Sequence, residues 1–271
     1  MWIYSSHVAM GVASVVSLLA LVWLATRQNP LTLGWRAVRY VLADNRALAL
    51  VVLAYAMIAF NLLENRLETR LAKTIRWDFT DAVSKVGTNL ILLLQQLEWP
   101  PVTHLLTFVY VILFPLLMLA GLLVYAANRD LAAMKNLVYG YWVNYLVALP
   151  FYLWVPVKEA WAGGAGIRFL IPEVFPGFEQ IVRPHSGLDN CIPSLHTSLA
   201  ITYALVAWRQ GYRRLAIVLS VCAGLVMLST LYLGVHWLLD MLAGVALGVV
   251  ASGYLVVPSP TTADGRLRTN P

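Results

Sequence analysis

Two short segments in the last third of the chain carry the side chains best suited to chemistry. They are Pro193-Ser-Leu-His196 and His236-Trp-Leu-Leu-Asp240. Residues four apart share one face of a helix, so the Asp240 carboxylate is close enough to accept a hydrogen bond from the His236 ring. Such a bond selects the available ring nitrogen and favours the imidazolium form, which turns a histidine into a positioned nucleophile. We therefore expect His236 to act as the nucleophile and Asp240 to orient it, with His196 as a second candidate catalytic histidine on the same side of the membrane.

Three other interpretations of these polar residues exist. Each histidine could simply cap a helix or lie in the membrane interface. His196, His236 and Asp240 could ligate a metal ion, but no His-Glu-x-x-His motif supports this. Cys191, in a loop, and Cys222, in an apolar run, suit neither a metal site nor a structural disulfide, so we predict no metal and no cofactor. Proton-coupled carriers also use intramembrane His and Asp, but they have paired halves, and no internal repeat is visible here.

The elements that must position these residues are membrane helices. The chain of 271 residues is 60% hydrophobic and 12% charged, whereas soluble domains carry about 25% charged residues. Its apolar residues form continuous runs near the roughly 20 residues that span a hydrocarbon core as a helix. Continuous rather than alternating runs favour helices over a barrel. We predict an all-α, polytopic membrane helical bundle with six or seven transmembrane helices, at about 8–26, 47–63, 103–126, 137–155, 194–209, 215–234 and 237–257.

Positive charge predicts the orientation of this bundle. Eleven of the 19 Lys and Arg residues fall on one side, in short loops that include a basic connection at 27–46. Cytoplasmic loops carry such an excess, so both histidines are expected at the outer or lumenal face. No Lys or Arg precedes the first run, which therefore predicts a retained span rather than a signal peptide. We expect an integral protein of the cell membrane.

A single integral-membrane domain is expected over residues 1–257, with the catalytic core at about 103–257. The polar tail, residues 258–271, is expected to be disordered. Between residues 64 and 100 the composition is mixed, and leucines at its start recur every four residues among charged side chains. This pattern predicts an amphipathic segment at the membrane interface.

Two glycine-containing features lie closer to the histidines. The loop at about 156–193 contains Ala162-Gly-Gly-Ala-Gly166, but no Gly-Lys-Ser/Thr follows, so we predict a flexible active-site loop rather than a phosphate loop. Gly244 and Gly248 form a GxxxG pair on the last run. This pair predicts close helix packing.

The motifs around both histidines resemble those of a known family. Asn190-Cys-Ile-Pro-Ser-Leu-His196 and Ser229-Thr-Leu-Tyr-Leu-Gly-Val-His236-Trp-Leu-Leu-Asp240 are similar to the second and third signatures of the type-2 phosphatidic acid phosphatase superfamily, which includes vanadium haloperoxidases. Within it they look most like the fungal inositol phosphorylceramide synthase branch. The resemblance implies that His236 attacks phosphorus while Asp240 holds it. It also implies that His196 protonates the leaving group and then activates water or an alcohol.

The sequence also departs from the family pattern. The first signature, a lysine followed seven residues later by Arg-Pro, is absent, and Thr230 stands where the third signature usually has arginine. The phosphate group must therefore be held differently. Our candidates for substrate phosphate binding are Lys158, Arg183 and Ser194, with Arg168 ranked behind them.

These observations predict a metal-independent lipid phosphatase or phosphotransferase that acts through a phosphohistidine. The resemblance favours transfer of a phosphoryl-containing headgroup between a lipid and an alcohol or water. The expected partners are a membrane lipid substrate and the bilayer, with no nucleic acid. Two alternatives remain, namely a proton-coupled membrane transporter and a catalytically inactive, lipid-binding relative.

Overall fold

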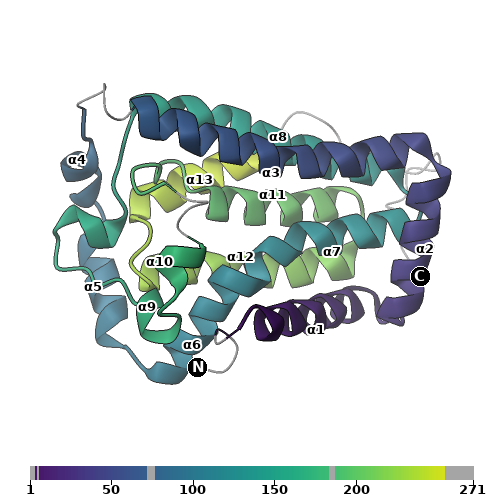
Figure 1. Cartoon of the computed structure of the whole chain (residues 1–271), viewed down its shortest axis with the longest axis horizontal. Coiled ribbons are helices and arrows are strands. Elements are labelled where there is room, and N and C mark those ends of the chain that lie inside the picture. The colour runs from purple at the N-terminus through teal and green to yellow at the C-terminus, as the bar shows by residue number, and fades with distance from the viewer. Residues whose placement is uncertain (1–3, 5, 72–76, 183–186, 254–271) are drawn as a thin grey trace.

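The computed structural model describes residues 4, 6–71, 77–182 and 187–253, and within these ranges the fold is all-α, as predicted (Figure 1). Each of the seven predicted apolar runs contains a helix. The long helices are α1 (His7–Thr26), α2 (Pro30–Ala43), α3 (Asn45–Leu71), α7 (Phe114–Ala127), α8 (Leu131–Trp154), α11 (Leu195–Arg209), α12 (Arg213–Tyr232) and α13 (Leu238–Ala251). The shorter ones are α4 (Thr80–Ser84), α5 (Thr88–Gln96), α6 (Pro100–Phe108), η2 (Val109–Leu113), η3 (Ala160–Gly163), α9 (Ile171–Val174) and α10 (Phe178–Ile181).

Fewer helices than predicted are long and apolar enough to cross a membrane. Within the described ranges three helical stretches qualify, namely His7–Thr26, Pro100–Ala127 and Arg213–Tyr232. A fourth arises if α2 and the first part of α3, which meet at 105°, form one bent span. Helices α11 and α13 have 15 and 14 residues, short of the roughly 20 that a span requires. The apolar helices support an integral membrane protein with three or four candidate spans, and six or seven are not shown.

The segment 27–46, predicted as a basic connection, contains a helix instead. The Asn29 side chain accepts hydrogen bonds from the first backbone N–H groups of α2. Pro30 takes the first helical position, where the missing N–H of proline is harmless. Leu33 and Ala37 are buried, on the side where α2 packs against α7. This helix lies across one end of the bundle (Figure 1).

The predicted interfacial segment is divided among several elements. Helix α3 continues without a break to Leu71, so the charged stretch after residue 63 extends a long helix rather than forming a separate one. The side chains of 62–71 and all of 72–76 lie outside the described residues, as does the tail at 258–271. The apolar end of this segment forms α5, which ends at Gln96, and a new helix begins at Pro100.

Helix α11 forms the centre of the bundle and packs against α7, α8, α12 and α13. Its contact with α13 is very close, as the GxxxG pair predicted. A β-carbon added to Gly244 would lie 2.6 Å from the Ser194 carbonyl oxygen, and one added to Gly248 would lie 2.6 Å from that of Ser198. Only glycine permits this approach, which holds the start of α13 beside the start of α11.

The long loop before α11 fixes the turn between α12 and α13. The Ala160 and Trp161 N–H groups donate to the carbonyls of Val235 and Gly234 at 3.2 and 2.9 Å. Gly234 adopts a left-handed backbone (φ 77°), and a β-carbon there would lie 2.3 Å from the Arg168 carbonyl oxygen. The loop therefore packs tightly on the turn that leads into His236.

Candidate active site

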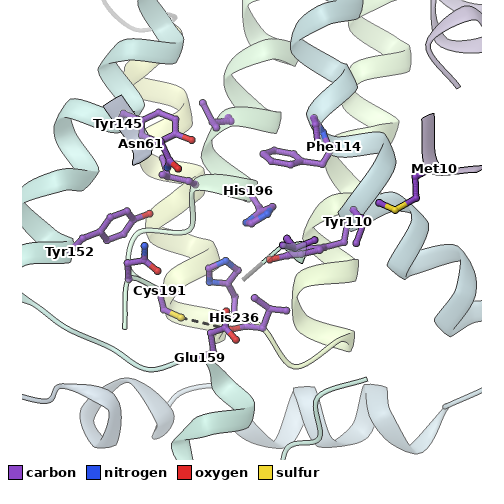
Figure 2. A pocket seen from close by; sticks show the side chains of 17 residues that line it. Met10, Asn61, Tyr110, Phe114, Tyr145, Tyr152, Glu159, Cys191, His196 and His236 are labelled. Atoms are coloured by element: carbon purple, nitrogen blue, oxygen red, sulfur yellow. Dashed lines mark hydrogen bonds between the residues drawn. The ribbon is translucent and has the colours of Figure 1, made fainter. Parts of the chain in front are cut away.

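Both histidines line one cavity of about 340 Å³ (Figure 2). Its walls come from segments far apart in the sequence, including α1, η2, α8, the long loop and α11. Most of the lining is apolar or aromatic. The polar side chains among the described lining residues are tyrosines, asparagines, Cys191, Glu159 and the two histidines. Such a cavity suits a ligand with a large apolar part and a small reactive group.

His196 lies in the first turn of α11. Ser194 begins this helix, because its hydroxyl oxygen accepts a hydrogen bond from the Thr197 N–H at 3.3 Å. The Ser194 N–H in turn donates to the Asp240 carbonyl at 3.0 Å. The ring of His196 stacks on that of Tyr110, with centroids 4.4 Å apart, and lies 4.6 Å from that of Phe114. Helix start and aromatic walls together fix the position of this imidazole.

The aromatic walls come from a distortion in the helical stretch 100–127. Residues Val109–Leu113 form a π-helical turn, a wider turn that is frequent at functional sites. Pro115 follows and has no N–H to donate to the carbonyl four residues earlier. This missing bond gives a physical reason for the wider turn, which carries Tyr110 into contact with His196.

His236 lies in the turn that precedes α13 and is 5% exposed. Its Nδ1 is 3.5 Å from Oδ2 of Asp240, a fully buried carboxylate. The predicted proximity is present, but Nδ1 makes no hydrogen bond, and neither does Asp240 Oδ1. Oδ2 instead accepts the Trp237 N–H at 2.9 Å. Asp240 therefore caps α13 while lying beside the ring.

The two histidine rings are neighbours, a point that the sequence left open. Their centroids lie 5.8 Å apart and their planes are inclined by 60°. Figure 2 shows both rings at the same cavity, one from the start of α11 and the other from the turn before α13. Two rings this close can both reach a single phosphoryl group.

The predicted phosphate-binding residues do not gather around the histidines. Ser194 is fully buried and caps α11. The Arg168 guanidinium pairs with Glu98 and lies 3.8 Å from Glu173. Arg183 lies outside the described residues. Among the described residues that line the cavity, none is a lysine or an arginine.

The Lys158 ammonium is directed to the molecular surface. Its Nζ lies 2.8 Å from Asp78 Oδ2, and both side chains are nearly half exposed. The hydrogen bond from Lys158 lowers the pKa of Asp78 to about 2, and Asp78 raises the pKa of Lys158. The backbone carbonyl of Lys158 meanwhile accepts the Trp237 indole N–H at 2.9 Å. Lys158 thus contacts the site through its backbone, and phosphate binding by its side chain stays a prediction.

Sequence reasoning missed several residues of the cavity. Glu159 is 4% exposed and accepts the Trp161 indole N–H at 2.5 Å. Cys191 is 2% exposed, and its Sγ lies 3.7 Å from the Val235 carbonyl oxygen. No motif marked Glu159, and Cys191 stood within a quoted motif without a role, since only the folded loop brings both residues to the cavity. The aromatic wall had one sequence signal, namely Pro115 inside an apolar run, because a proline there disturbs the helix that carries Tyr110.

Comparisons with known proteins cover only part of the chain. A protein of Escherichia coli (strain K12) named "Putative undecaprenyl-diphosphatase YbjG" is 37% identical over 68 residues, or 24% of this chain. These residues are 33% of that protein, so the chain spans about a third of the length of the curated relative it matches. No solved structure matches the chain. Neither the family match nor this relative points to the inositol phosphorylceramide synthase branch.

The family match covers the site itself. Residues 167–261 match the family described as PAP2 superfamily. This range includes His196, His236 and Asp240, so it contains both motifs on which the resemblance was based. This match over the C-terminal part of the chain supports the predicted superfamily.

Proposed function

We propose that this protein is an integral-membrane phosphatase of lipid phosphates that works through a phosphohistidine on His236. The observation that carries the proposal is the pair of histidine rings, 5.8 Å apart at one largely apolar cavity. They come from two motifs 40 residues apart in the sequence. The match of residues 167–261 to the PAP2 superfamily supports a lipid phosphate as the substrate class.

The proposed reaction has two steps. In the first, a ring nitrogen of His236 forms a bond to phosphorus, the bond from phosphorus to the leaving oxygen breaks, and His196 donates a proton to that oxygen. In the second, His196 takes a proton from water, whose oxygen attacks phosphorus and releases His236. Dividing one displacement into two lowers the barrier of each. Asp240 stabilises the charge that develops on His236.

The substrate class follows from the walls of the cavity. Met10, Val111, Phe114 and Leu199 offer apolar contacts to a lipid chain near the histidines. The relative's name suggests a polyprenyl diphosphate, whose terminal phosphoryl group would be transferred with a lipid monophosphate as the leaving group. Such a leaving group needs less help from an acid than an alkoxide does. Transfer to an alcohol is the second candidate reaction, because an alcohol can replace water in the second step and uses the same base.

The positive charge that this reaction requires remains to be assigned. Phosphoryl transfer depends on cationic groups around the equatorial oxygens. We propose Arg183 as the principal cation, because it comes 13 residues before His196 in the sequence, in the segment between the fourth and fifth predicted spans. Ser194 and Lys158 remain secondary candidates. We also propose that the site faces the outer or lumenal side, as the charge pattern predicted.

The test is turnover by the protein purified in detergent. Polyprenyl diphosphates, phosphatidate and phosphodiester lipids are supplied with EDTA, first with water alone and then with added alcohols. Phosphate release should survive EDTA and fall at least about 10³-fold in His236→Ala and His196→Ala. His104→Ala is the matched control, because His104 is exposed and outside the cavity lining. Unchanged turnover in His236→Ala would overturn the mechanism, and no turnover of any substrate would favour the transporter or the inactive relative.

A further inference from the structure

Three different metal-binding side chains lie close together, and two of them line the cavity. One ligand atom from each of Cys191, His236 and Asp240 can be chosen so that all three lie within 4.8 Å of one another. The three side chains are 2%, 5% and 0% exposed in that order. They come from the long loop, the turn after α12 and the first turn of α13. The proposed phosphoryl transfer uses His236 and Asp240 but gives the Cys191 thiol no role.

The arrangement also leaves two buried ligand atoms without a hydrogen bond. In the described part of the chain neither His236 Nδ1 nor Asp240 Oδ1 has a hydrogen-bond partner. Buried polar atoms normally have one, and each exception calls for an explanation such as a water or an ion. The Cys191 thiol is held next to them because the Cys191 N–H donates to the Val157 carbonyl at 3.3 Å. The cluster is therefore built by the fold of the loop.

The chemistry of these ligands selects the metal. Thiolate and imidazole favour Zn²⁺ and similar borderline ions, whereas Mg²⁺ and Ca²⁺ prefer oxygen ligands. Zinc lies about 2.0–2.3 Å from such atoms, so tetrahedral ligands stand roughly 3.5 Å apart. The separations here, at most 4.8 Å, would close by about 1 Å on binding. Three protein ligands leave the fourth position open toward the cavity, to be filled by water or by a substrate oxygen.

We propose that Cys191, His236 and Asp240 form a binding site for Zn²⁺, and that the bound ion inhibits the enzyme. On binding, the thiol loses its proton to solvent as the sulfur–zinc bond forms. A neutral imidazole has one nitrogen with a lone pair and one with a proton. Once zinc takes the lone pair of His236, the other nitrogen carries the proton, so neither can attack phosphorus. The inhibition rests on the proposed function, but the binding does not.

The test begins with binding, which needs no substrate. Metal-free protein in detergent is titrated with Zn²⁺, and with Co²⁺ as a spectroscopic substitute that shows a thiolate-to-cobalt charge-transfer band. We expect one ion per chain, and Cys191→Ser should weaken binding by at least about 100-fold, because even outer-shell partners are worth 10–100-fold. Cys222→Ser is the matched control and should bind as the wild type does, since Cys222 is a buried cysteine in α12, outside the cluster. Excess Mg²⁺ should not displace the ion.

A second measurement avoids dependence on the folding of the Cys191→Ser variant. In Cys222→Ser protein, Zn²⁺ should slow alkylation of Cys191 by a small maleimide, whereas Mg²⁺ should not. Absence of both the cobalt band and the protection would overturn the proposal, as would tight binding by a folded Cys191→Ser variant. If zinc binds and no lipid phosphate is turned over, the proposed function fails and the site stands. If His236-dependent turnover is indifferent to zinc, the inhibitory role alone fails.

Discussion

Gly244→Ala is the most direct perturbation of the contact that brings the two histidines together. The added β-carbon would lie 2.6 Å from the Ser194 carbonyl oxygen, about 0.8 Å inside ordinary contact, and 3.0 Å from Thr197 Cβ. A carbonyl held at a helix start cannot turn aside, so α13 must move away from α11. Overpacking of this kind costs about 1–3 kcal/mol, from which the roughly 1 kcal/mol preference of helices for Ala over Gly is subtracted.

The same displacement should damage activity more than stability. Ser194 adjoins His196, and its N–H donates to the Asp240 carbonyl at 3.0 Å, so the shift occurs where the reacting groups lie. Misplacement of such groups by about 1 Å costs on the order of 10²-fold in rate. We therefore expect Gly244→Ala to lower kcat/KM for a lipid phosphate by about that factor.

Two other glycines supply matched controls for this experiment. Gly248→Ala makes an equally close contact one turn further along α13, so it should destabilise similarly but slow turnover less. Gly224→Ala, with nothing within 4 Å of the added carbon, should change neither quantity appreciably. Thermal unfolding in detergent and steady-state kinetics measure both. If Gly244→Ala behaves like Gly224→Ala, the close helix contact does not position the histidines.

Further predictions concern the carboxylate and the surface ion pair. Asp240→Asn retains an oxygen for the Trp237 N–H but loses the charge beside His236. The value of kcat should therefore fall about 10²–10⁴-fold, while the unfolding temperature changes little. A large drop in the unfolding temperature together with the loss of kcat would refute this separation of roles. Lys158→Met should leave kcat within about threefold, because its ammonium lies on Asp78 rather than at the cavity. A large kcat loss, with Asp78→Asn as control, would restore Lys158 as a phosphate ligand. The stability that this exposed pair contributes, at most about 1 kcal/mol, should be constant from pH 5 to 8. Because the pKa of Asp78 is lowered to about 2, the stabilisation by this pair is lost only as the pH falls toward that value. The raised pKa of Lys158 keeps the lysine charged across the whole range. A change in the stability difference between pH 5 and 8 would contradict this assignment.

Much of the fold could be predicted because hydrophobic runs report helices directly. All seven predicted runs contain helices, and the GxxxG pair marks the closest contact between two of them. The count of membrane spans could not be predicted as well, because helix and span are different properties. Helices α11 and α13 are buried at the centre of the bundle, where apolar composition reflects packing as much as lipid contact.

The helix over Pro30–Ala43 escaped prediction for a different reason. Its basic residues suggested a connection between spans, although Asn29-Pro30 was a start signal for a helix. Charge pattern and helix capping are independent features, so a basic composition does not exclude a helix.

The residues of the site likewise fall into those that the sequence could predict and those that it could not. His196, His236 and Asp240 could be identified because they stand in a known pattern. The predicted helical spacing of His236 and Asp240 was wrong in detail, since His236 precedes α13 and does not lie on it. Cys191 and Glu159 could not, since tertiary folding of the loop brings them to the cavity. The source of positive charge is the largest remaining gap, because the family's usual cations are missing at their expected positions.

The central claim is that His236 carries the phosphoryl group, and a covalent trap tests it most directly. Purified protein with EDTA is mixed with polyprenyl diphosphate labelled with ³²P at its terminal phosphate, quenched in alkali and digested for peptide mapping. We predict an alkali-stable, acid-labile label on the peptide that contains His236, absent in His236→Ala and present in His104→Ala. Turnover of the same substrate with the label on another residue, or undiminished in His236→Ala, would contradict the phosphohistidine mechanism.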